Sequence, residues 1–334
     1  MTVFCGGIDV GGTKIASALF TCEGEISARE KVAIDSAGGD AAAVQVAGRI
    51  RALAAAAAES GGRLAAVGIC VPGIAYSASG KVWAPNIPGW DQYPLIEKIR
   101  GLCSAPVPLV LESDRSAYVA GEAWQGAAAG AADAVFLAVG TGIGAGIVSG
   151  GRILHGHEDI AGAVGWFGLD PDFKAEYAAM GCFEAEASGN SLARKARERL
   201  GQGRASSMPD LAGGRLEAVT AEVVAAAARS GDVLALEIVA EAVAYLGMGI
   251  ANIVSLLNPE IVVVGGGLFH AADVLLEPVR REVGRWAQPL AARGVRIELS
   301  GLGEDAGLYG CGRLAWQYHQ DGGHAADFRV PGEK

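Results

Sequence analysis

The 334-residue sequence predicts an α/β protein made of two similar halves with a ligand cleft between them. Two observations predict this architecture. Glycine-rich turns stand between apolar strand patterns at 11–14 and again at 140–146, and strand and helix patterns follow each turn in a similar order. A chain of this length is also long enough for two domains.

The first glycine turn carries side chains that suit a nucleotide. Asp9 ends an apolar run, the turn holds Gly11, Gly12, Thr13 and Lys14, and a second strand pattern follows at once. Glycines let backbone N–H groups approach an anion closely because they have no Cβ. A carboxylate such as Asp9 can hold hydrated Mg²⁺, and a hydroxyl and an ammonium can contact phosphate oxygens. The same residues are equally compatible with an ordinary tight β-hairpin.

The rest of the first half alternates between helix and strand. An alanine-rich helix is expected at 40–60 and a buried strand at 65–71. The loop at 80–91 is rich in Pro, Gly and Trp. Its Trp83 and Trp90 either plug the loop onto the domain or form the wall of a ligand site, since aromatic side chains in a rigid loop suit sugar recognition.

The next strand places carboxylates at its end. It is expected at 107–111, Glu112, Ser113 and Asp114 follow it, and a helix is expected at 115–128. A carboxylate at the carboxyl end of a buried strand is a common catalytic position in open α/β sheets. Asp114 also has the position of a helix N-cap, and the two roles are compatible.

The second half repeats this pattern. Its expected helices are at 220–229, 232–257, 271–286 and 306–318, and its strands at 134–139, 261–264 and 295–299. The strand at 261–264 is a continuous apolar run, which indicates burial on both faces. It leads into Gly265 and Gly266, a third turn where backbone can approach a ligand. The tail at 321–334 has a loosely ordered composition.

Composition narrows the class of protein. The net charge is −10 with no block of Lys or Arg, which argues against nucleic acid or an anionic membrane as the main partner. The most apolar stretches, near 52–58 and 248–257, are shorter than a bilayer span, and the first nine residues show no secretory signal. Six cysteines lack paired spacing, as expected for reduced thiols. These features predict a cytoplasmic protein.

Taken together, the motifs resemble the ROK family (repressor, open reading frame, kinase), whose members have the two-lobed, duplicated sugar kinase/actin/Hsp70-like (ribonuclease H-like) fold. The resemblance covers nearly the full length. The matching motifs are Asp-Val-Gly-Gly-Thr-Lys at 9–14, Val-Pro-Gly at 71–73, Glu-Ser-Asp at 112–114, Gly-Glu-Ala-Trp at 121–124, Gly-Thr-Gly-Ile-Gly at 140–144, Gly-Cys-Phe-Glu at 181–184 with Ala-Ser-Gly at 187–189, Asn-Pro-Glu-Ile-Val-Val-Val-Gly-Gly-Gly at 258–267, and Gly-Glu-Asp-Ala-Gly at 303–307.

The resemblance implies a division into lobes. It predicts an N-terminal lobe at 1–114 that is completed by the C-terminal helix at about 304–320, a second lobe at 115–303, and a tail at 321–334. It also implies an ATP-dependent sugar kinase that uses Mg²⁺ and forms a homodimer.

The resemblance also implies roles for individual residues. Asp114 corresponds to the catalytic base, which accepts the proton of a sugar hydroxyl as the phosphorus–oxygen bond forms. The expected nucleotide contacts are Asp9, Gly11, Gly12, Thr13, Lys14, Gly140, Thr141, Gly142, Gly144, Gly265 and Gly266. The expected sugar contacts are Gly73, Asn86, Ser113, Asp114, Trp166 and Glu184.

The chain departs from the family pattern around the sugar. Ser113 stands where Asn is usual, Ala163 stands where a sugar-binding Glu is expected, and Trp166 stands where a His is expected. The nearby Glu158 and Asp159 are candidates to restore a carboxylate. We therefore expect a sugar or cyclitol whose C1/C2 end differs from that of free glucose or mannose.

The same change removes the family's usual zinc motif, which joins that His to three cysteines. Only Cys182 is present in the stretch 170–182, and one thiol cannot build a tetrahedral site of N and S ligands. We expect no structural zinc, and we expect His155 and His157 to be loop or substrate-facing residues.

Two other readings remain. A catalytically weak sugar- or nucleotide-binding or regulatory protein of the same fold is supported by the altered sugar motif, and the retained nucleotide motifs and Asp114 argue against it. A ROK transcriptional repressor is disfavoured, because such proteins carry a DNA-binding segment ahead of the first glycine turn and only eight residues precede Asp9 here. ATP is the expected phosphoryl donor, and polyphosphate is the alternative.

Overall fold

The computed structural model describes residues 1–103 and 107–322 and contains two compact units. The first unit comprises Met1–Ala134, Gly146–Ala161 and the segment from Ser300 onward, and the second comprises Val135–Ala145 and Gly162–Leu299. The first unit therefore extends past the boundary predicted at 114, because the helix that follows Asp114 packs against the C-terminal helix of the same unit. Most of the predicted tail lies outside the described residues.

The first unit is built on a five-stranded mixed sheet. Its strands are β1 (Thr2–Val10), β2 (Lys14–Phe20), β3 (Ile26–Ala33), β4 (Gly62–Val71) and β7 (Leu109–Ser113), in the spatial order β3-β2-β1-β4-β7. Strands β1, β4 and β7 are parallel, and β2 and β3 are antiparallel to their neighbours. The carboxyl ends of three parallel strands therefore lie side by side.

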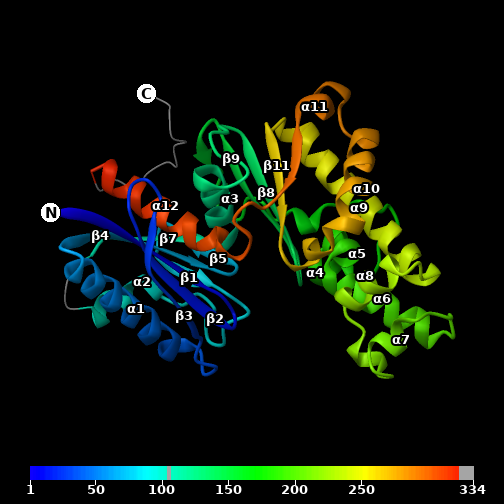
Figure 1. Cartoon of the computed structure of the whole chain (residues 1–334), viewed down its shortest axis with the longest axis horizontal. Coiled ribbons are helices and arrows are strands. Elements are labelled where there is room, and N and C mark those ends of the chain that lie inside the picture. Colours follow the sequence, from blue (N-terminus) through cyan, green and yellow to red (C-terminus); the bar gives the residue numbers. More distant parts are fainter. Residues whose placement is uncertain (104–106, 323–334) are drawn as a thin grey trace. The chain divides into compact units, whose positions relative to one another are not determined.

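Helices cover both faces of this sheet (Figure 1). They are α1 (Gly39–Glu59), α2 (Leu95–Leu102), α3 (Asp114–Gln125) and α12 (Ala306–Gln320). The short strands β5 (Ile74–Tyr76) and β6 (Lys81–Trp83) form a separate pair, and the short strand β10 (Arg152–Ile153) joins the edge of the second sheet. Apolar residues of α1 such as Val46 and Leu53 pack into one core. On the other face α12 approaches the backbone closely, since a Cβ at Gly68 would lie 2.1 Å from the Cys311 carbonyl oxygen.

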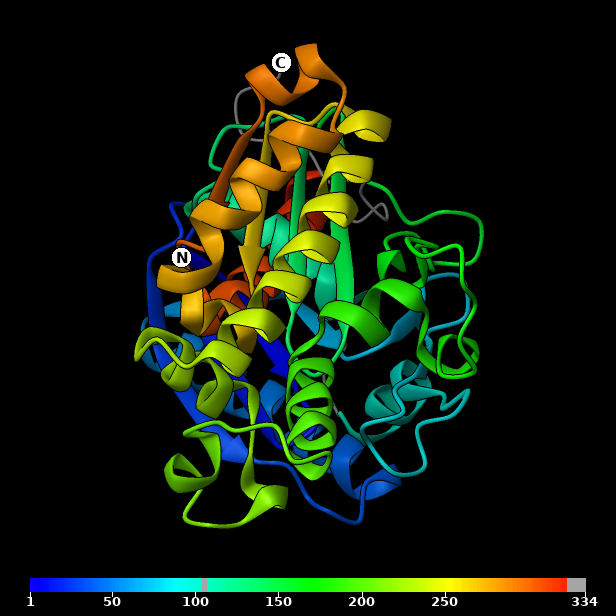
Figure 2. The same cartoon turned by 90° about the vertical axis from the view of Figure 1, so that its right-hand side faces the viewer.

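The second sheet has the order β10-β9-β8-β11-β12. Its other strands are β8 (Ala134–Val139), β9 (Ile143–Ser149), β11 (Ile261–Gly265) and β12 (Arg296–Leu299). Every residue of β11 is buried, as its apolar run predicts. The main helices of the second unit are α5 (Cys182–Ala187), α6 (Gly189–Gly201), α8 (Ala221–Arg229), α9 (Val233–Leu257) and α10 (Ala272–Trp286), and Figure 2 shows α9 and α10 side by side. Shorter helices are α4 (Tyr177–Met180), α7 (Met208–Leu211) and α11 (Pro289–Gly294).

The predicted elements from residue 39 onward agree with the structure to within three residues at each end. The pattern did not predict α2 or the helices between 177 and 211. Two of these, α4 and α7, are only a single turn long, and α6 has a polar, strongly charged sequence.

Two helices correct the expectation that no apolar stretch is long enough for a membrane. Gly39–Glu59 and Val233–Leu257 reach the length and hydropathy of a membrane span, with mean hydropathies of 1.2 and 1.8. In each, much of the apolar surface is packed inside its own unit, and that packing is typical of a core helix. All six cysteines are free thiols, and four of them, including Cys70 and Cys182, are buried.

Candidate functional site

In the first unit, the ends of the parallel strands bring three functional groups together. In the strand register Asp9 of β1 lies opposite Cys70 of β4, and Val71 lies opposite Ser113 of β7. Asp114 follows Ser113 directly as the first residue of α3. The Cys70 thiol donates a hydrogen bond to Asp9 Oδ1 at 3.3 Å. The sequence-predicted pair Asp9 and Asp114 thus stands at one edge of one sheet.

Asp114 is held as a first-turn carboxylate rather than as the helix cap. The cap is Ser113, whose buried Oγ accepts a hydrogen bond from Ser116 N and donates one to Ser116 Oγ. Asp114 Oδ1 accepts from Arg115 N at 2.8 Å, and Tyr118 OH donates to Asp114 Oδ2 at 3.4 Å. The N-cap reading of Asp114 is therefore wrong, because the residue before it fills that position.

Burial raises the pKa of Asp114 to about 6. The Arg115 charge lowers this pKa, the nearby Asp9 charge raises it, and the hydrogen bonds from Arg115 N and Tyr118 lower it. Burial also raises the pKa of Asp9, against the hydrogen bond from Cys70 and the charge of Lys14. A carboxylate whose pKa approaches neutrality has the proton affinity that a general base requires.

Asp9 also faces a glycine of the C-terminal helix. A Cβ at Gly307 would lie 2.8 Å from Asp9 Oδ2 and 3.0 Å from the Tyr118 ring. Any larger residue at 307 would displace one of these groups. The sequence pattern named neither Cys70, Tyr118 nor Gly307 as a site residue, although Gly307 ends the last family motif.

The first glycine turn joins β1 to β2. Gly11 N donates to the Lys14 carbonyl oxygen at 2.8 Å, and Gly12, Thr13 and Lys14 are exposed. The Lys14 ammonium lies 2.8 Å from Glu304 Oε2. A phosphate contact by Lys14 would therefore have to compete with this ion pair.

The remaining first-unit residues lie in the loop at 80–91 and its neighbours. Asn86 is exposed next to the glycine turn, where a Cβ at Gly12 would lie 3.2 Å from the Asn86 Cβ. Gly73 has a φ of 109°, and a Cβ there would lie 2.2 Å from the Trp83 carbonyl oxygen. Trp90 is buried and stacked on Tyr93.

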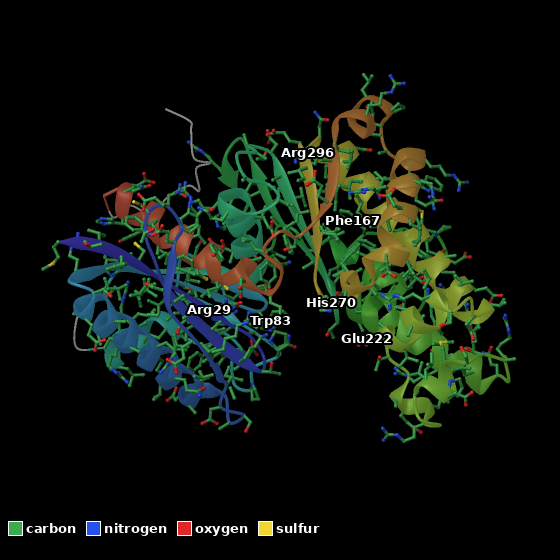
Figure 3. All side chains as sticks on the ribbon, viewed as in Figure 1. Arg29, Trp83, Phe167, Glu222, His270 and Arg296 are labelled. Atoms are coloured by element: carbon green, nitrogen blue, oxygen red, sulfur yellow. The ribbon has the colours of Figure 1, made fainter. Side chains whose placement is uncertain are left out.

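Of the two roles considered for these tryptophans, the structure shows the anchoring role for Trp90, and the ligand role stays a prediction for Trp83. Trp90 anchors the loop, and its indole N–H donates to the Gly39 carbonyl oxygen. Trp83 is 40% exposed and available to a ligand (Figure 3).

A partly buried pair lies on the other side of the Glu-Ser-Asp motif. His155 Nε2 is 2.6 Å from Glu112 Oε1, so His155 is a partner of Glu112. Asp159 accepts hydrogen bonds from Ser77 N and Oγ. The carboxylate that was expected to restore a sugar contact is thus already engaged, while the neighbouring Glu158 is exposed.

In the second unit, the glycine turn between β8 and β9 is tied to a carboxylate. Gly140 N donates to the Gly142 carbonyl oxygen at 2.9 Å, and Thr141 is exposed at the tip. Ile143 N donates to Glu184 Oε2 at 2.7 Å. A Cβ at Gly142 would lie 2.6 Å from the same oxygen. The proposed sugar residue Glu184 is therefore also a support of the proposed phosphate turn.

Burial raises the pKa of Glu184, and the Ile143 N–H lowers it.

The third turn lies beside the second one. Gly266 has a φ of 92°, and a Cβ on it would lie 2.5 Å from the Val139 carbonyl oxygen at the end of β8. A Cβ on the preceding Gly265 would lie 2.5 Å from the Phe136 ring. Glycines at these positions let the two turns approach each other closely.

The altered sugar motif forms a short 3-10 turn, Val164–Trp166. Trp166 is 58% exposed, and Ala163 precedes the turn. Gly181 lies against this turn, because a Cβ there would lie 2.4 Å from the Gly165 carbonyl oxygen. Within residues 1–103 and 107–322, no three His, Cys, Asp or Glu side chains are grouped as metal ligands would be.

Comparison with known proteins places the chain in a family. The model of the ROK family matches residues 5–318. The chain is 34% identical over 315 residues to the glucokinase of Halalkalibacterium halodurans, which covers 93% of this chain and 94% of the relative. A crystal structure of a ROK family glucokinase from Streptomyces griseus, in complex with glucose and AMPPNP, is 30% identical with a TM-score of 0.76 and covers 94% of this chain and 99% of that one.

Repressors are also among the relatives. The DNA-binding transcriptional repressor Mlc of Escherichia coli is 30% identical over 238 residues, which are 71% of this chain and 57% of the repressor. The solved structures confirm the predicted two-lobed sugar kinase/actin-like fold class. The family match spans nearly the whole chain, so the protein is a member of the ROK family.

Proposed function

We propose that this protein is an ATP-dependent kinase that phosphorylates a hydroxyl group of a hexose, amino sugar or sugar-like polyol. The observation that carries the proposal is Asp114, a partly buried carboxylate at the end of a parallel strand with a pKa near 6. The kinases among its relatives and the AMPPNP complex of a relative support ATP as the donor.

Asp114 is the proposed general base. Its carboxylate would accept the proton of the attacking sugar hydroxyl while the γ-phosphoryl group is transferred to the oxygen. The hydrogen bonds from Arg115 N and Tyr118 orient the carboxylate. They also lower its pKa, which favours the ionised form. A base of this kind typically contributes roughly 10²–10⁴-fold to the rate.

The remaining chemistry is positioning and charge neutralisation. The glycine turns at 11–14 and 140–144, together with Gly265 and Gly266, are the proposed backbone contacts to ATP. Mg²⁺, when bound with the nucleotide, supplies positive charge at the phosphates. Asp9 fits as its protein ligand through water, because it is a carboxylate at a strand end that faces a glycine, Gly307.

For the sugar, we propose contacts from Gly73, Asn86, Ser113, Asp114 and Glu184, and an apolar ring contact from Trp166. The exposed Trp83 is a further candidate. The exposed indole of Trp166 suits the apolar face of a ring. Because Ala163 offers no hydrogen bond, a sugar or cyclitol that differs from glucose at its C1/C2 end should be the better substrate. Glucose as the best substrate, with efficiency typical of a glucokinase, would refute this part.

A second function is a regulatory protein that binds sugar and nucleotide and turns over slowly. It is favoured by Ala163 and Trp166 and by the presence of a repressor among the relatives. The presence of Asp114 and its raised pKa favours the kinase.

The test is an ADP-release assay with Mg-ATP against a panel of hexoses, amino sugars, ketoses, anhydro-sugars and cyclitols. Polyphosphate is run as an alternative donor, and Asp114→Asn is the control. The proposal expects turnover of at least one compound that is lost in the control. ATP binding with no turnover across the panel would favour the regulatory protein.

The proposed assembly rests on the resemblance, and the proposed location rests on the composition of the chain. A cytoplasmic homodimer is expected, with no binding to nucleic acid or membrane. Sedimentation equilibrium of the purified chain would measure the assembly, and a mass of one chain at micromolar concentration would contradict the dimer.

A further inference from the structure

The segment that carries Trp166 and Glu184 is held to the rest of the second unit by a cluster of charged side chains around one buried carboxylate. Glu186 lies on α5, two residues after Glu184, and is only 3% exposed. Its Oε1 lies 2.6 Å from the Lys174 ammonium and its Oε2 lies 2.6 Å from the Lys195 ammonium. Tyr177 OH also donates to Oε1. Lys174 and Tyr177 come from the stretch before and at the start of α4, whereas Lys195 comes from α6.

The cluster extends to two further helices. Lys195 on α6 also donates to the Glu186 carbonyl oxygen at 3.1 Å and lies 5.5 Å from the centre of the Tyr245 ring on α9. Tyr245 OH and Tyr177 OH each lie within 3.3 Å of Asp170 Oδ2. The loop before α4 is thereby connected through side chains to α5, α6 and α9.

The pKa values agree with this geometry. Burial raises the pKa of Glu186, but the hydrogen bonds from Lys174, Lys195 and Tyr177 outweigh burial and lower it to about 2. Glu186 is thus ionised at neutral pH and compensated on both oxygens. Such a group is costly to disturb, because loss of the Glu186 charge leaves the Lys195 ammonium, only 10% exposed, without its nearest carboxylate.

The segment around Glu186 also packs against the turn that carries the proposed sugar contact Trp166. Phe183 N donates to the Phe167 carbonyl oxygen at 3.2 Å, and the two rings stack at 6.5 Å. Gly181 lies in contact with the Gly165–Trp166 backbone. The turn that presents Trp166 therefore lies directly on the segment that Glu186 fixes.

A structural zinc does not fit these residues. The family's zinc motif would need a His at 166, where an exposed tryptophan stands, and three cysteines in a segment that holds only Cys182. An indole is not a zinc ligand, and four N, S or O ligands are needed. Cys182 is itself buried.

We infer that the Lys174–Glu186–Lys195 cluster, with Tyr177, does in this chain what a structural metal would do, and that Glu186 is a positioning residue for the sugar-binding segment. Its role toward the sugar rests on the proposed function, whereas its role in ordering the segment does not. The protein should accordingly keep this segment ordered without zinc.

Hydrogen exchange of the peptide covering 168–187 tests the cluster directly. Glu186→Gln keeps the shape but removes the charge, and it should speed exchange of this peptide by about tenfold or more. Glu237→Gln is the matched control, because Glu237 makes an exposed pair with Arg204 and neither residue belongs to the measured peptide. Equal exchange in E186Q and E237Q would overturn the inference.

A second substitution distinguishes charge compensation from packing. Lys195→Met in the E186Q background removes the ammonium that has lost its nearest carboxylate and is left with Glu241 Oε2 at 3.6 Å, and it should bring exchange back toward the wild-type rate. No recovery in the double variant would contradict charge compensation. If E186Q does not fold, Lys174→Met at the half-exposed rim of the cluster should speed exchange of the same peptide, and an unchanged rate would count against the cluster.

Metal content and kinetics complete the test. Purified protein should contain far less than one zinc per chain, and dialysis against EDTA should leave exchange of 168–187 unchanged. Stoichiometric zinc whose removal speeds this exchange would overturn the inference. With a sugar that is turned over, E186Q should raise its KM by about tenfold and change kcat less. Hydrogen exchange reads the segment even if no sugar is phosphorylated, so failure of the inference and failure of the proposed function are distinguishable.

Discussion

Substitutions around Asp114 should change the pH dependence of phosphorylation in opposite directions. Only the ionised carboxylate can accept the proton of the sugar hydroxyl, and burial raises its pKa to about 6. Below this pH kcat/KM should therefore fall about tenfold per pH unit, so that at pH 5 roughly one tenth of the protein is competent. Asp114→Asn should lower kcat by roughly 10²–10⁴-fold and abolish this limb of the profile.

Variants of two neighbouring residues should shift the pKa of Asp114 in opposite directions. The Tyr118 hydrogen bond lowers the pKa of Asp114, so Tyr118→Phe should move the acidic limb to higher pH. The Asp9 charge raises the same pKa, so Asp9→Asn should move the limb to lower pH, whatever it does to the maximal rate. The two shifts are opposite because the first variant removes a hydrogen bond to the carboxylate and the second removes a nearby negative charge.

The assay is direct quantification of ADP by chromatography between pH 4.5 and 8.5, which avoids coupling enzymes that fail in acid. A wild-type profile that is flat from pH 5 to 8 would refute the assignment of Asp114 as the base. A limb that stays at the same pH in both the Tyr118 and the Asp9 variants would also refute it.

Three further variants test other contacts. Gly307→Ala places a Cβ 2.8 Å from an Asp9 carboxylate oxygen and should lower kcat about tenfold or more. Gly284→Ala is the control and should keep full activity, because its Cβ meets nothing within 4 Å. Equal activities of the two variants would show that the fit at Asp9 is unimportant. Glu184→Ala removes the acceptor of a turn N–H and should raise the KM for ATP about tenfold, while Glu184→Gln keeps an acceptor and should not; a KM for ATP that is unchanged in both would show that Glu184 does not support the turn. Lys14→Met should raise the KM for ATP by roughly tenfold or more, because we expect the Lys14 ammonium to leave Glu304 for a phosphate of ATP. An unchanged affinity for ATP in isothermal titration would show that Lys14 stays paired with Glu304.

The order of the elements could be predicted from sequence because it depends on local patterns. The apolar run at 261–264 is long enough for one strand and is bounded by Pro259 and Gly265, and this pattern predicts a buried strand. In the same way, the short strand before Asp114 and the amphipathic pattern after it fix that carboxylate at a strand end.

Other features depend on tertiary contacts that a pattern does not encode. The cap of α3 is Ser113 and not Asp114, since only the backbone geometry decides which of two good capping residues takes the position. Trp90 and Trp83 have the same chemistry in one loop, yet only Trp90 finds a pocket against Tyr93. Sequence alone could not separate them.

The charged cluster around Glu186 shows the same limit more sharply. Lys174, Glu186 and Lys195 are charged residues, which by composition are expected at the surface. They meet because the loop before α4 and helix α6 both lie against α5, and the Glu186 carboxylate then lies between two ammonium groups. The i to i+9 spacing of Glu186 and Lys195 gives no periodic signal.

The most direct test of the central claim is to identify the products of one reaction. The protein is mixed with Mg-ATP and the preferred compound of the sugar panel, and the reaction is followed by phosphorus NMR. The account predicts that each ATP consumed yields one ADP and one phosphate ester of the sugar, and that Asp114→Asn forms neither at a comparable rate. Formation of ADP and inorganic phosphate without a sugar phosphate, or equal turnover by the Asp114→Asn variant, would contradict it.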